Sequence, residues 1–277
     1  MERREAILLR LRPVRDVDQL VVALSPAVGK LEFLARGTRK IESKLNPSLQ
    51  LFARVMLDSV PGRRAHHLTG VEVLDPFPRL RTRLTGLAQA GFVAEVAEAL
   101  SASNQAEPRL FRLVRRELLR IERARDDRLG PADVLSLSLF ALRALAVTGW
   151  RPRFGQCSVC HRPLGAVAAV FAAHPYGFAH GSCARNRSLR SGSGQADADP
   201  IPLHRATRKF LYERLSQTTQ PAVVPRGVAQ EVDRVALTAL EAVLDRALKS
   251  RRFLRMFTKE RITNHESRNA ESHSPDS

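Results

Sequence analysis

The feature that most constrains this chain is a pair of short metal-ligand motifs. Cys157 and Cys160 are separated by two residues, and His180 and Cys183 are separated in the same way. The three cysteines in these motifs are all the cysteines of the chain. A two-residue spacing lets two side chains converge on one ion from a single turn, and Cys and His are the usual ligands of tetrahedral Zn2+. The spacing therefore predicts a zinc knuckle.

Four protein ligands leave no open position on the metal, so the predicted zinc site is structural and not catalytic. His161 and His174 compete with His180 for the fourth position, and His180 is favoured because its spacing matches that of the first pair. In an alternative interpretation, Cys157 and Cys160 are a redox pair and Cys183 is a free core thiol. Zinc binding at such sites is coupled to folding by about 10–16 kcal/mol, so the knuckle would stabilise a fold without defining its function.

The charge of the chain favours polyanionic partners. Its 277 residues, enough for about two domains, include 45 Lys and Arg against 28 Asp and Glu, which gives a net charge of +17 and a pI near 11.2. This excess of positive charge makes nucleic acid the first candidate binding partner and an anionic membrane surface the second. No apolar stretch reaches the roughly 18 residues of a membrane span, and the first apolar run is too short for a signal peptide. We expect a cytoplasmic, nucleoid-associated protein with reduced thiols and no membrane partner.

Residues 1–79 have the pattern of a small β-barrel. Short β-prone runs alternate with Pro and Gly breakers, and they lie at 6–11, 20–24, 31–35, 49–57 and 68–74. Five short strands in so short a segment are typical of a closed or partly open barrel. The sequence therefore predicts an N-terminal OB-fold domain.

A basic loop follows the third of these runs. Residues 35–40 read Ala-Arg-Gly-Thr-Arg-Lys, and the cluster of positively charged residues extends to Lys30 on one side and Lys44 on the other. Gly37 would let the loop backbone approach a phosphate, and strands on either side of such a loop flank the binding groove of OB folds. A solvated surface turn is the alternative. Phe33 and Phe52 are the candidate base-stacking residues, although both are favoured as core residues.

Residues 80–257 read as an α-helical domain into which the knuckle, at 154–186, is inserted. Helical periodicity predicts helices at 80–100, 107–125, 131–148, 207–215 and 228–248, the last continuing into 249–255. Trp150, the only tryptophan, is expected to seal the junction with the knuckle. The polar residues 258–277 are predicted to be disordered. The fold class is α+β.

The second of these helices has an arginine stripe opposite its apolar face, with no carboxylate expected within it. A solvated helix face usually mixes charges of both signs. The stripe is therefore a candidate face for an anionic partner, and its proposed members are Arg112, Arg116, Arg120 and Arg123.

The sequence shows no recognisable catalytic centre. The phosphate-binding loop, the dinucleotide fingerprint and the H-E-x-x-H motif are missing. A zinc deaminase would need a Glu beside its metal-binding His and an open ligand position, and neither cysteine or histidine pair has such a Glu. We expect a binding protein and not an enzyme.

The chain resembles the bacterial recombination mediator family RecO in four places. Residues 5–10 resemble the family's first strand, and residues 35–40 resemble its A-R-G-x-R-K signature. The Cys/His pairs resemble its four-cysteine knuckle, with His180 where family members that bind zinc usually carry Cys. Residues 249–254, Lys-Ser-Arg-Arg-Phe-Leu, resemble its closing K-S-R motif.

The resemblance implies a non-enzymatic role in DNA repair and recombination. A family member binds single- and double-stranded DNA, anneals complementary strands and helps to load RecA onto strands coated by single-strand binding protein. The implied partners are RecR, on the barrel side, and the C-terminal tail of single-strand binding protein, on the helical domain. By resemblance, Arg36, Arg39 and Lys40 are phosphate contacts, and Lys30 and Lys44 are additional candidates from the cluster of positively charged residues. An RNA-binding or ribosome-associated protein with the same barrel and knuckle is the alternative.

Overall fold

The computed structural model describes residues 1–14, 16–40, 42–43, 45–62, 66–165, 169–174, 176–188, 199–216, 224–254 and 256–257. Lys44 and the tail at 258–277 lie outside the described residues. The chain divides into two compact units, which are Met1–Gly130 with the described part of Leu248–Ser277, and Pro131–Ala247. The first three helices thus share a compact unit with the barrel, and the boundary between units falls at Gly130. No helix among the described residues is both long and apolar enough to cross a membrane.

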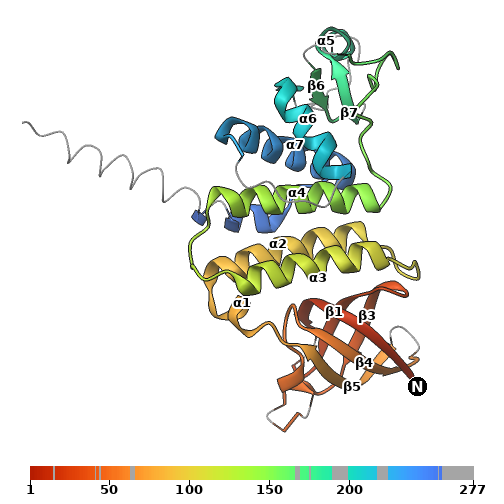
Figure 1. Cartoon of the computed structure of the whole chain (residues 1–277). Coiled ribbons are helices and arrows are strands. Elements are labelled where there is room, and N and C mark those ends of the chain that lie inside the picture. Colours follow the sequence, from red (N-terminus) through yellow and green to blue (C-terminus); the bar gives the residue numbers. More distant parts are fainter. Residues whose placement is uncertain are drawn as a thin grey trace, which may run out of the picture. The chain divides into compact units, whose positions relative to one another are not determined.

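Five strands close into a barrel in the first unit (Figure 1). They pair in the order β1-β2-β3-β5-β4, and β3 and β5 run parallel while the other pairs are antiparallel. Alternate side chains point inward, as the pleat of a strand requires, and Val21, Ala23, Leu31 and Phe33 lie in the core. The predicted OB-like barrel is confirmed. Its strands are β1 (Glu2–Pro13), β2 (Gln19–Ser25), β3 (Gly29–Ala35), β4 (Arg54–Val60) and β5 (His66–Asp75).

The fourth strand begins later than the sequence predicts. A short 3-10 turn, η1 (Asn46–Ser48), precedes it, and Phe52 has a left-handed backbone with φ of 71°. The Phe52 N–H donates to the Leu8 carbonyl at 2.9 Å, which fixes this turn against β1. The side chains of Phe33 and Phe52 are buried, with 0% and 3% exposure. Both are core residues, which confirms the favoured interpretation, and the alternative that they stack on bases is wrong.

Three helices complete the first unit. They are α1 (Pro78–Thr82), α2 (Leu84–Leu100) and α3 (Pro108–Arg123). The apolar face of α3 is buried, including Leu110, Val114, Leu118 and Ile121. The β2–β3 hairpin contacts the loop between α2 and α3, because the Lys30 N–H donates to the Ala102 carbonyl at 2.9 Å and the Glu107 N–H donates to the Pro26 carbonyl at 3.1 Å. These bonds orient the barrel against the helices.

The second unit is built on α4 (Pro131–Val147), whose apolar residues are largely buried, as predicted. It packs against α7 (Arg226–Leu244) and α6 (Arg205–Ser216), and the Ser138 hydroxyl donates to Asp233 at 2.8 Å. A small antiparallel sheet in the order β7-β6-β8 is also present, with α5 (Gly181–Ser188) following β7. Its strands were not predicted because they are only three or four residues long: β6 (Ala169–Ala172), β7 (Gly177–His180) and β8 (Ile201–Leu203).

Two expectations for the helical region are wrong. The last helix does not continue through residue 248, because α7 ends at Leu244 and Asp245 has a left-handed φ of 50°. A separate helical stretch begins at Lys249, where the N–H groups of Lys249 and Ser250 donate to the Glu95 carboxylate on α2. Trp150 does not seal a junction either, since it is 49% exposed.

Candidate metal centre and nucleic-acid interface

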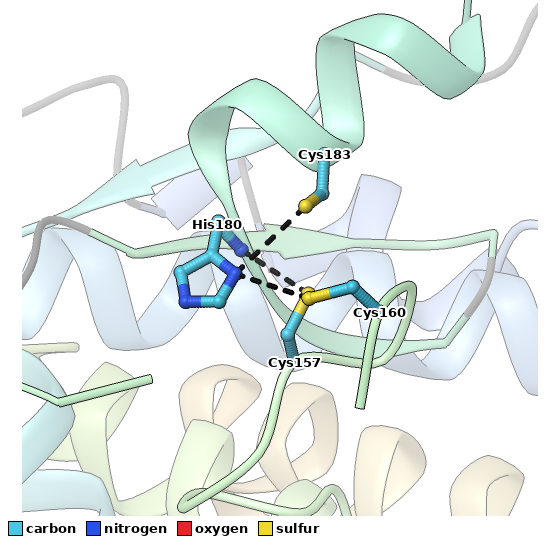
Figure 2. Close-up of side chains that lie close together, drawn as sticks. All are labelled: Cys157, Cys160, His180 and Cys183. Atoms are coloured by element: carbon cyan, nitrogen blue, oxygen red, sulfur yellow. Dashed lines mark hydrogen bonds between the residues drawn. The ribbon is translucent and has the colours of Figure 1, made fainter. Parts of the chain in front are cut away.

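Three cysteines and one histidine converge in the second unit (Figure 2). Cys157 and Cys160 lie in the segment after α4, His180 ends β7, and Cys183 lies in the first turn of α5. Their ligand atoms all lie within 4.8 Å of one another. Because β7 leads directly into α5, the second pair is presented on a strand-to-helix turn beside the first pair.

The backbone around Cys157 forms a tight knuckle. The Cys157 N–H donates to the Arg162 carbonyl at 2.9 Å, and the His161 N–H donates back to the Cys157 carbonyl at 3.0 Å. His161 itself has a left-handed φ of 59°, which closes the turn. The Ser158 N–H donates to the Phe178 carbonyl at 2.8 Å and so attaches the knuckle to β7.

The environment of Cys157 favours its thiolate form. Burial on its own would raise the pKa of this thiol, but N–H groups of Cys160, His180 and Val159 outweigh it and lower the pKa from 9.0 to about 6. The His180 N–H lies 3.5 Å from Sγ. The pKa of Cys183 is raised by burial and by the neighbouring thiols, whose like charges a cation would compensate.

The ring of His180 is oriented for a metal. Its Nε2 lies 3.2 Å from the Pro163 carbonyl, and an N–H at this position donates to that oxygen. The lone pair is then on Nδ1, which lies 3.5 Å from the Cys160 Sγ and 3.8 Å from the Cys183 Sγ. Metal-binding histidines are commonly held by such a bond from the second ring nitrogen.

The donor set and its dimensions fit a structural Zn2+ ion. Ligands bound at about 2.0–2.3 Å in a tetrahedron lie roughly 3.5–3.8 Å from each other, which agrees with the Nδ1–Sγ distances. The three cysteines are free thiols and form no disulfide. Among the described residues, these three cysteines and His180 form the group that could hold a metal. His161 and His174 are exposed and do not belong to this group.

The basic loop after β3 lies against the turn between β1 and β2. Gly37 has a left-handed φ of 64°, and its N–H donates to the Asp18 carboxylate at 2.8 Å. The Arg39 N–H donates to the Val17 carbonyl at 3.0 Å. Gly37 therefore shapes the loop, and its N–H already has a partner, in contrast to the expected approach to a phosphate. Arg36, Arg39 and Lys40 are exposed at this end of the barrel.

Lys30 is not grouped with these three cations. It lies near the opposite end of β3, six residues from Arg36, and a strand rises about 3.3 Å per residue. The two positions are therefore about 20 Å apart. Sequence reasoning placed them together because they are close along the chain, and it missed the β1–β2 turn, whose Val14 and Val17 are 50% and 36% exposed beside the loop. The pairing of strands 1 and 2 is the signal that could have revealed this turn.

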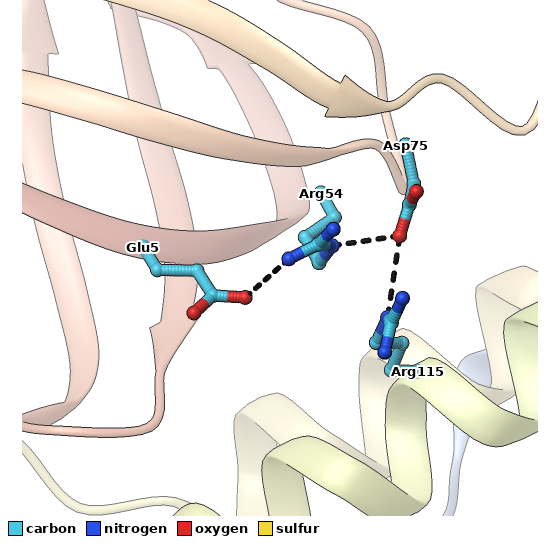
Figure 3. A network of polar contacts seen from close by, with 4 residues as sticks. All are labelled: Glu5, Arg54, Asp75 and Arg115. Atoms are coloured by element: carbon cyan, nitrogen blue, oxygen red, sulfur yellow. Dashed lines mark hydrogen bonds and ion pairs between the residues drawn. The ribbon is translucent and has the colours of Figure 1, made fainter.

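A polar network joins the barrel to α3 within the first unit (Figure 3). Arg54, at the start of β4, donates to Glu5 on β1 and to Asp75 at the end of β5, both at 2.7 Å. Arg115 on α3 donates to the same Asp75 oxygen at 3.2 Å. The hydrogen bond and charge of Asp75 raise the pKa of Arg54, so this guanidinium stays charged.

The arginine stripe on α3 divides into two parts. Arg112, Arg116 and Arg123 are exposed. Arg120 is different, because its Nε donates to Glu117 at 2.7 Å and its other nitrogen reaches the Gln89 amide oxygen at 2.7 Å. The sequence pattern placed no carboxylate within the stripe and Glu117 beside the apolar face, and this buried Glu117 pairs with one member of the stripe, Arg120. The remaining candidate face consists of the three exposed arginines.

These features define a class of protein in which an OB-type barrel precedes a helical region that carries a three-cysteine, one-histidine knuckle. The chain matches the family description "Recombination protein O N terminal" over residues 1–77 and "Recombination protein O C terminal" over residues 81–252. The chain therefore belongs to the recombination protein O, or RecO, family.

Proteins similar in sequence to this chain are named DNA repair protein RecO. The chain is 36% identical over 156 residues to the DNA repair protein RecO of Desulforudis audaxviator, a match that covers 56% of this chain and 60% of that protein. It is 35% identical over 158 residues to the DNA repair protein RecO of a Roseiflexus species, covering 57% and 53%. For the DNA repair protein RecO of Geobacter sulfurreducens, the identity is 28% over 255 residues, covering 92% and 97%.

Proposed function

We propose that this protein is a non-enzymatic recombination mediator in DNA repair. It binds single- and double-stranded DNA, anneals complementary strands and, with RecR, helps to load RecA onto strands coated by single-strand binding protein. The observation that carries the proposal is the exposed cluster of Arg36, Arg39 and Lys40 at one end of an OB-like barrel in a RecO-family chain. A cytoplasmic, nucleoid-associated location is part of the proposal.

The cluster has the chemistry that annealing requires. Two DNA strands repel each other, and cations that neutralise phosphates on both reduce this repulsion and release counterions. The loop that carries the cations is held by the Gly37–Asp18 and Arg39–Val17 bonds, so little loop ordering opposes binding. The net charge of +17 attracts DNA over a longer range. Arg112, Arg116 and Arg123 are proposed as a further anionic-partner face.

Zinc has a supporting role in this proposal. The ion would be held by Cys157, Cys160, His180 and Cys183, and it would supply a cross-link between the knuckle turn and the β7–α5 turn. A site with four protein ligands has no position for a substrate or a water. The protein partners, RecR and the C-terminal tail of single-strand binding protein, are proposed from family membership.

The test is the annealing of complementary fluorescent oligonucleotides by the full chain, without nucleotide or magnesium, over a salt series. We expect rapid annealing that slows as salt rises. In the triple variant Arg36→Ala, Arg39→Ala and Lys40→Ala, the slope of log affinity against log salt should become shallower by about 2 for single strands, since each phosphate contact contributes about 0.7.

The control removes the same charge elsewhere. Arg128, Arg226 and Arg234 are exposed, and the corresponding triple alanine variant should keep the slope of the wild type. An unchanged slope in the loop variant would remove the loop from the site. No annealing by folded protein at low salt would contradict the mediator function, and tighter binding to structured RNA than to single-stranded DNA at equal salt would favour the RNA alternative.

A further inference from the structure

Six aromatic rings of the second unit form a continuous chain. The ring of Trp150 contacts Tyr176 with centroids 6.4 Å apart, and Tyr176 contacts Phe171 at 5.6 Å. Phe171 contacts Phe178 at 5.4 Å, and Phe178 contacts Phe154 at 4.9 Å. The last contact, from Phe154 to Tyr212, is 5.9 Å. In a chain with only 5% aromatic residues, this concentration beside the knuckle is unusual.

The two ends of this aromatic chain are exposed, although its middle is core. Phe171 and Phe178 are 0% and 1% exposed, whereas Trp150 and Tyr212 are 49% and 56% exposed. The middle of the aromatic chain therefore packs in the core beside the knuckle, and the two exposed rings are available to a ligand. Tyr and Trp are enriched at binding interfaces, because each ring offers an apolar face together with a polar group.

The backbone of Trp150 is held in place, which reduces the cost of ordering its ring on binding. Its N–H donates to the Leu145 carbonyl at 2.8 Å, and its carbonyl accepts a hydrogen bond from the Tyr176 hydroxyl at 2.9 Å. Tyr212 lies on α6, one turn after Arg208 and Lys209 on the same helix face. The Arg208 guanidinium donates to the Gly165 carbonyl in the segment after the knuckle turn.

Around Trp150 and the knuckle the charge has one sign over a long stretch of sequence, whereas beside Tyr212 the Glu213 carboxylate lies 3.9 Å from the Lys209 ammonium. Between Asp133 and Asp197 the chain contains no Asp or Glu, and it contains seven arginines. Arg151 and Arg153 follow Trp150 directly, and both are exposed. Arg162 and Arg185, beside the knuckle cysteines, are exposed as well. The ligand that complements this surface is an anion with planar rings.

We propose that Trp150 and Tyr212, with the cations beside them, are stacking sites of a second nucleic-acid surface, which binds the bases and phosphates of a single strand. Aromatic rings next to arginines are the usual recognition elements for single-stranded nucleic acid. A duplex keeps its bases stacked on each other and offers no free face to either ring. The inference rests on the proposed function for the class of ligand and adds a site remote in sequence from the barrel loop.

Trp150 is the only tryptophan, so its fluorescence reports on this surface alone. The experiment titrates the full chain with an unlabelled thymidine 20-mer and follows tryptophan emission, while the anisotropy of a labelled 20-mer measures total binding separately. We expect the single strand to quench the emission, and inorganic polyphosphate, which has charge without bases, to leave it unchanged. Quenching should persist in the Arg36→Ala, Arg39→Ala, Lys40→Ala variant.

Variants test the second ring. In the barrel-loop variant background, Tyr212→Ala should weaken binding of the 20-mer about tenfold, and Tyr212→Phe, which keeps the ring, should bind like its parent. Leu84→Ala, at a 60% exposed apolar residue of the first unit, is the control and should also bind like its parent.

The outcomes separate the two proposals. A rise in anisotropy without quenching leaves the proposed function standing and overturns the second surface, and the absence of both signals contradicts both. Equal quenching by polyphosphate also overturns the stacking proposal. Quenching by an acidic peptide but not by the 20-mer overturns it in favour of a protein partner. Equal binding by Tyr212→Ala and Tyr212→Phe removes Tyr212 from the site.

Discussion

At the scale of single residues, the ionisation of the Asp75 carboxylate affects the stability of the first unit. Burial on its own would raise the pKa of Asp75, but the hydrogen bonds and charges of Arg54 and Arg115 outweigh burial and lower it. Because the folded pKa lies below the unfolded value of about 3.9, the carboxylate stabilises the fold above pH ~4. This stability is lost as the pH falls through the folded pKa.

Replacement of Asp75 by Asn should therefore lower the free energy of unfolding at pH 7 by about 1–2 kcal/mol, with a smaller further loss in acid than the wild type shows. Urea denaturation at pH 7 and pH 3 measures both effects. Asp126→Asn, at an exposed carboxylate, is the control and should follow the wild type. A parallel loss of stability in acid by the wild type and Asp75→Asn would contradict the assignment.

At the scale of elements, the β2–β3 hairpin depends on Gly29 to contact the α2–α3 loop. Gly29 has a φ of 70°, and a Cβ there would lie 2.3 Å from the Gln105 carbonyl oxygen and 2.4 Å from that of Ala102. Gly37 has a similar φ of 64°, but its nearest neighbour would be the flexible Lys40 side chain at 3.8 Å. An alanine at Gly37 would therefore introduce backbone strain alone, whereas an alanine at Gly29 would introduce both strain and a steric clash.

We expect Gly29→Ala to lower the free energy of unfolding by about 3 kcal/mol or more, because the clash involves backbone and cannot relax locally. Gly37→Ala should cost only about 1–2 kcal/mol, the strain of a left-handed alanine. Chemical denaturation of both variants gives the comparison. Equal losses would mean that the hairpin moves away from the α2–α3 loop without penalty.

At the scale of the whole molecule, the candidate metal site lies within one compact unit, Pro131–Ala247. Removal of zinc with a chelator should speed hydrogen exchange in the knuckle, β7 and α5, because the ion would join these segments, and in β6, which pairs with β7. Barrel amides should keep their protection. His180→Ala should reduce the bound zinc, measured by metal analysis, from one ion per chain towards none, and His161→Ala should retain it. Loss of zinc in His161→Ala alone would reverse the ligand assignment.

Features encoded in local patterns were predictable from the sequence. The two-residue spacing of Cys157–Cys160 and of His180–Cys183 identified the four side chains that converge, since one turn fixes each pair. Five β-prone runs separated by breakers indicated the barrel, and the apolar stripe of α3 indicated its buried face. Boundaries were less accurate at β4 and at the end of α7, because hydrogen bonds to residues distant in sequence decide whether a weak pattern continues.

Only the tertiary structure decided which side chains meet. It separated Lys30 from the basic loop and brought Arg120 on α3 to Gln89 on α2, because strand direction and helix packing decide which side chains share a surface. It also linked six aromatic rings from segments between Trp150 and Tyr212. The sequence alone determined the ligand chemistry and the kind of fold, since these follow from residue type and short-range spacing. Contacts across the fold depend on long-range packing, which no local pattern contains.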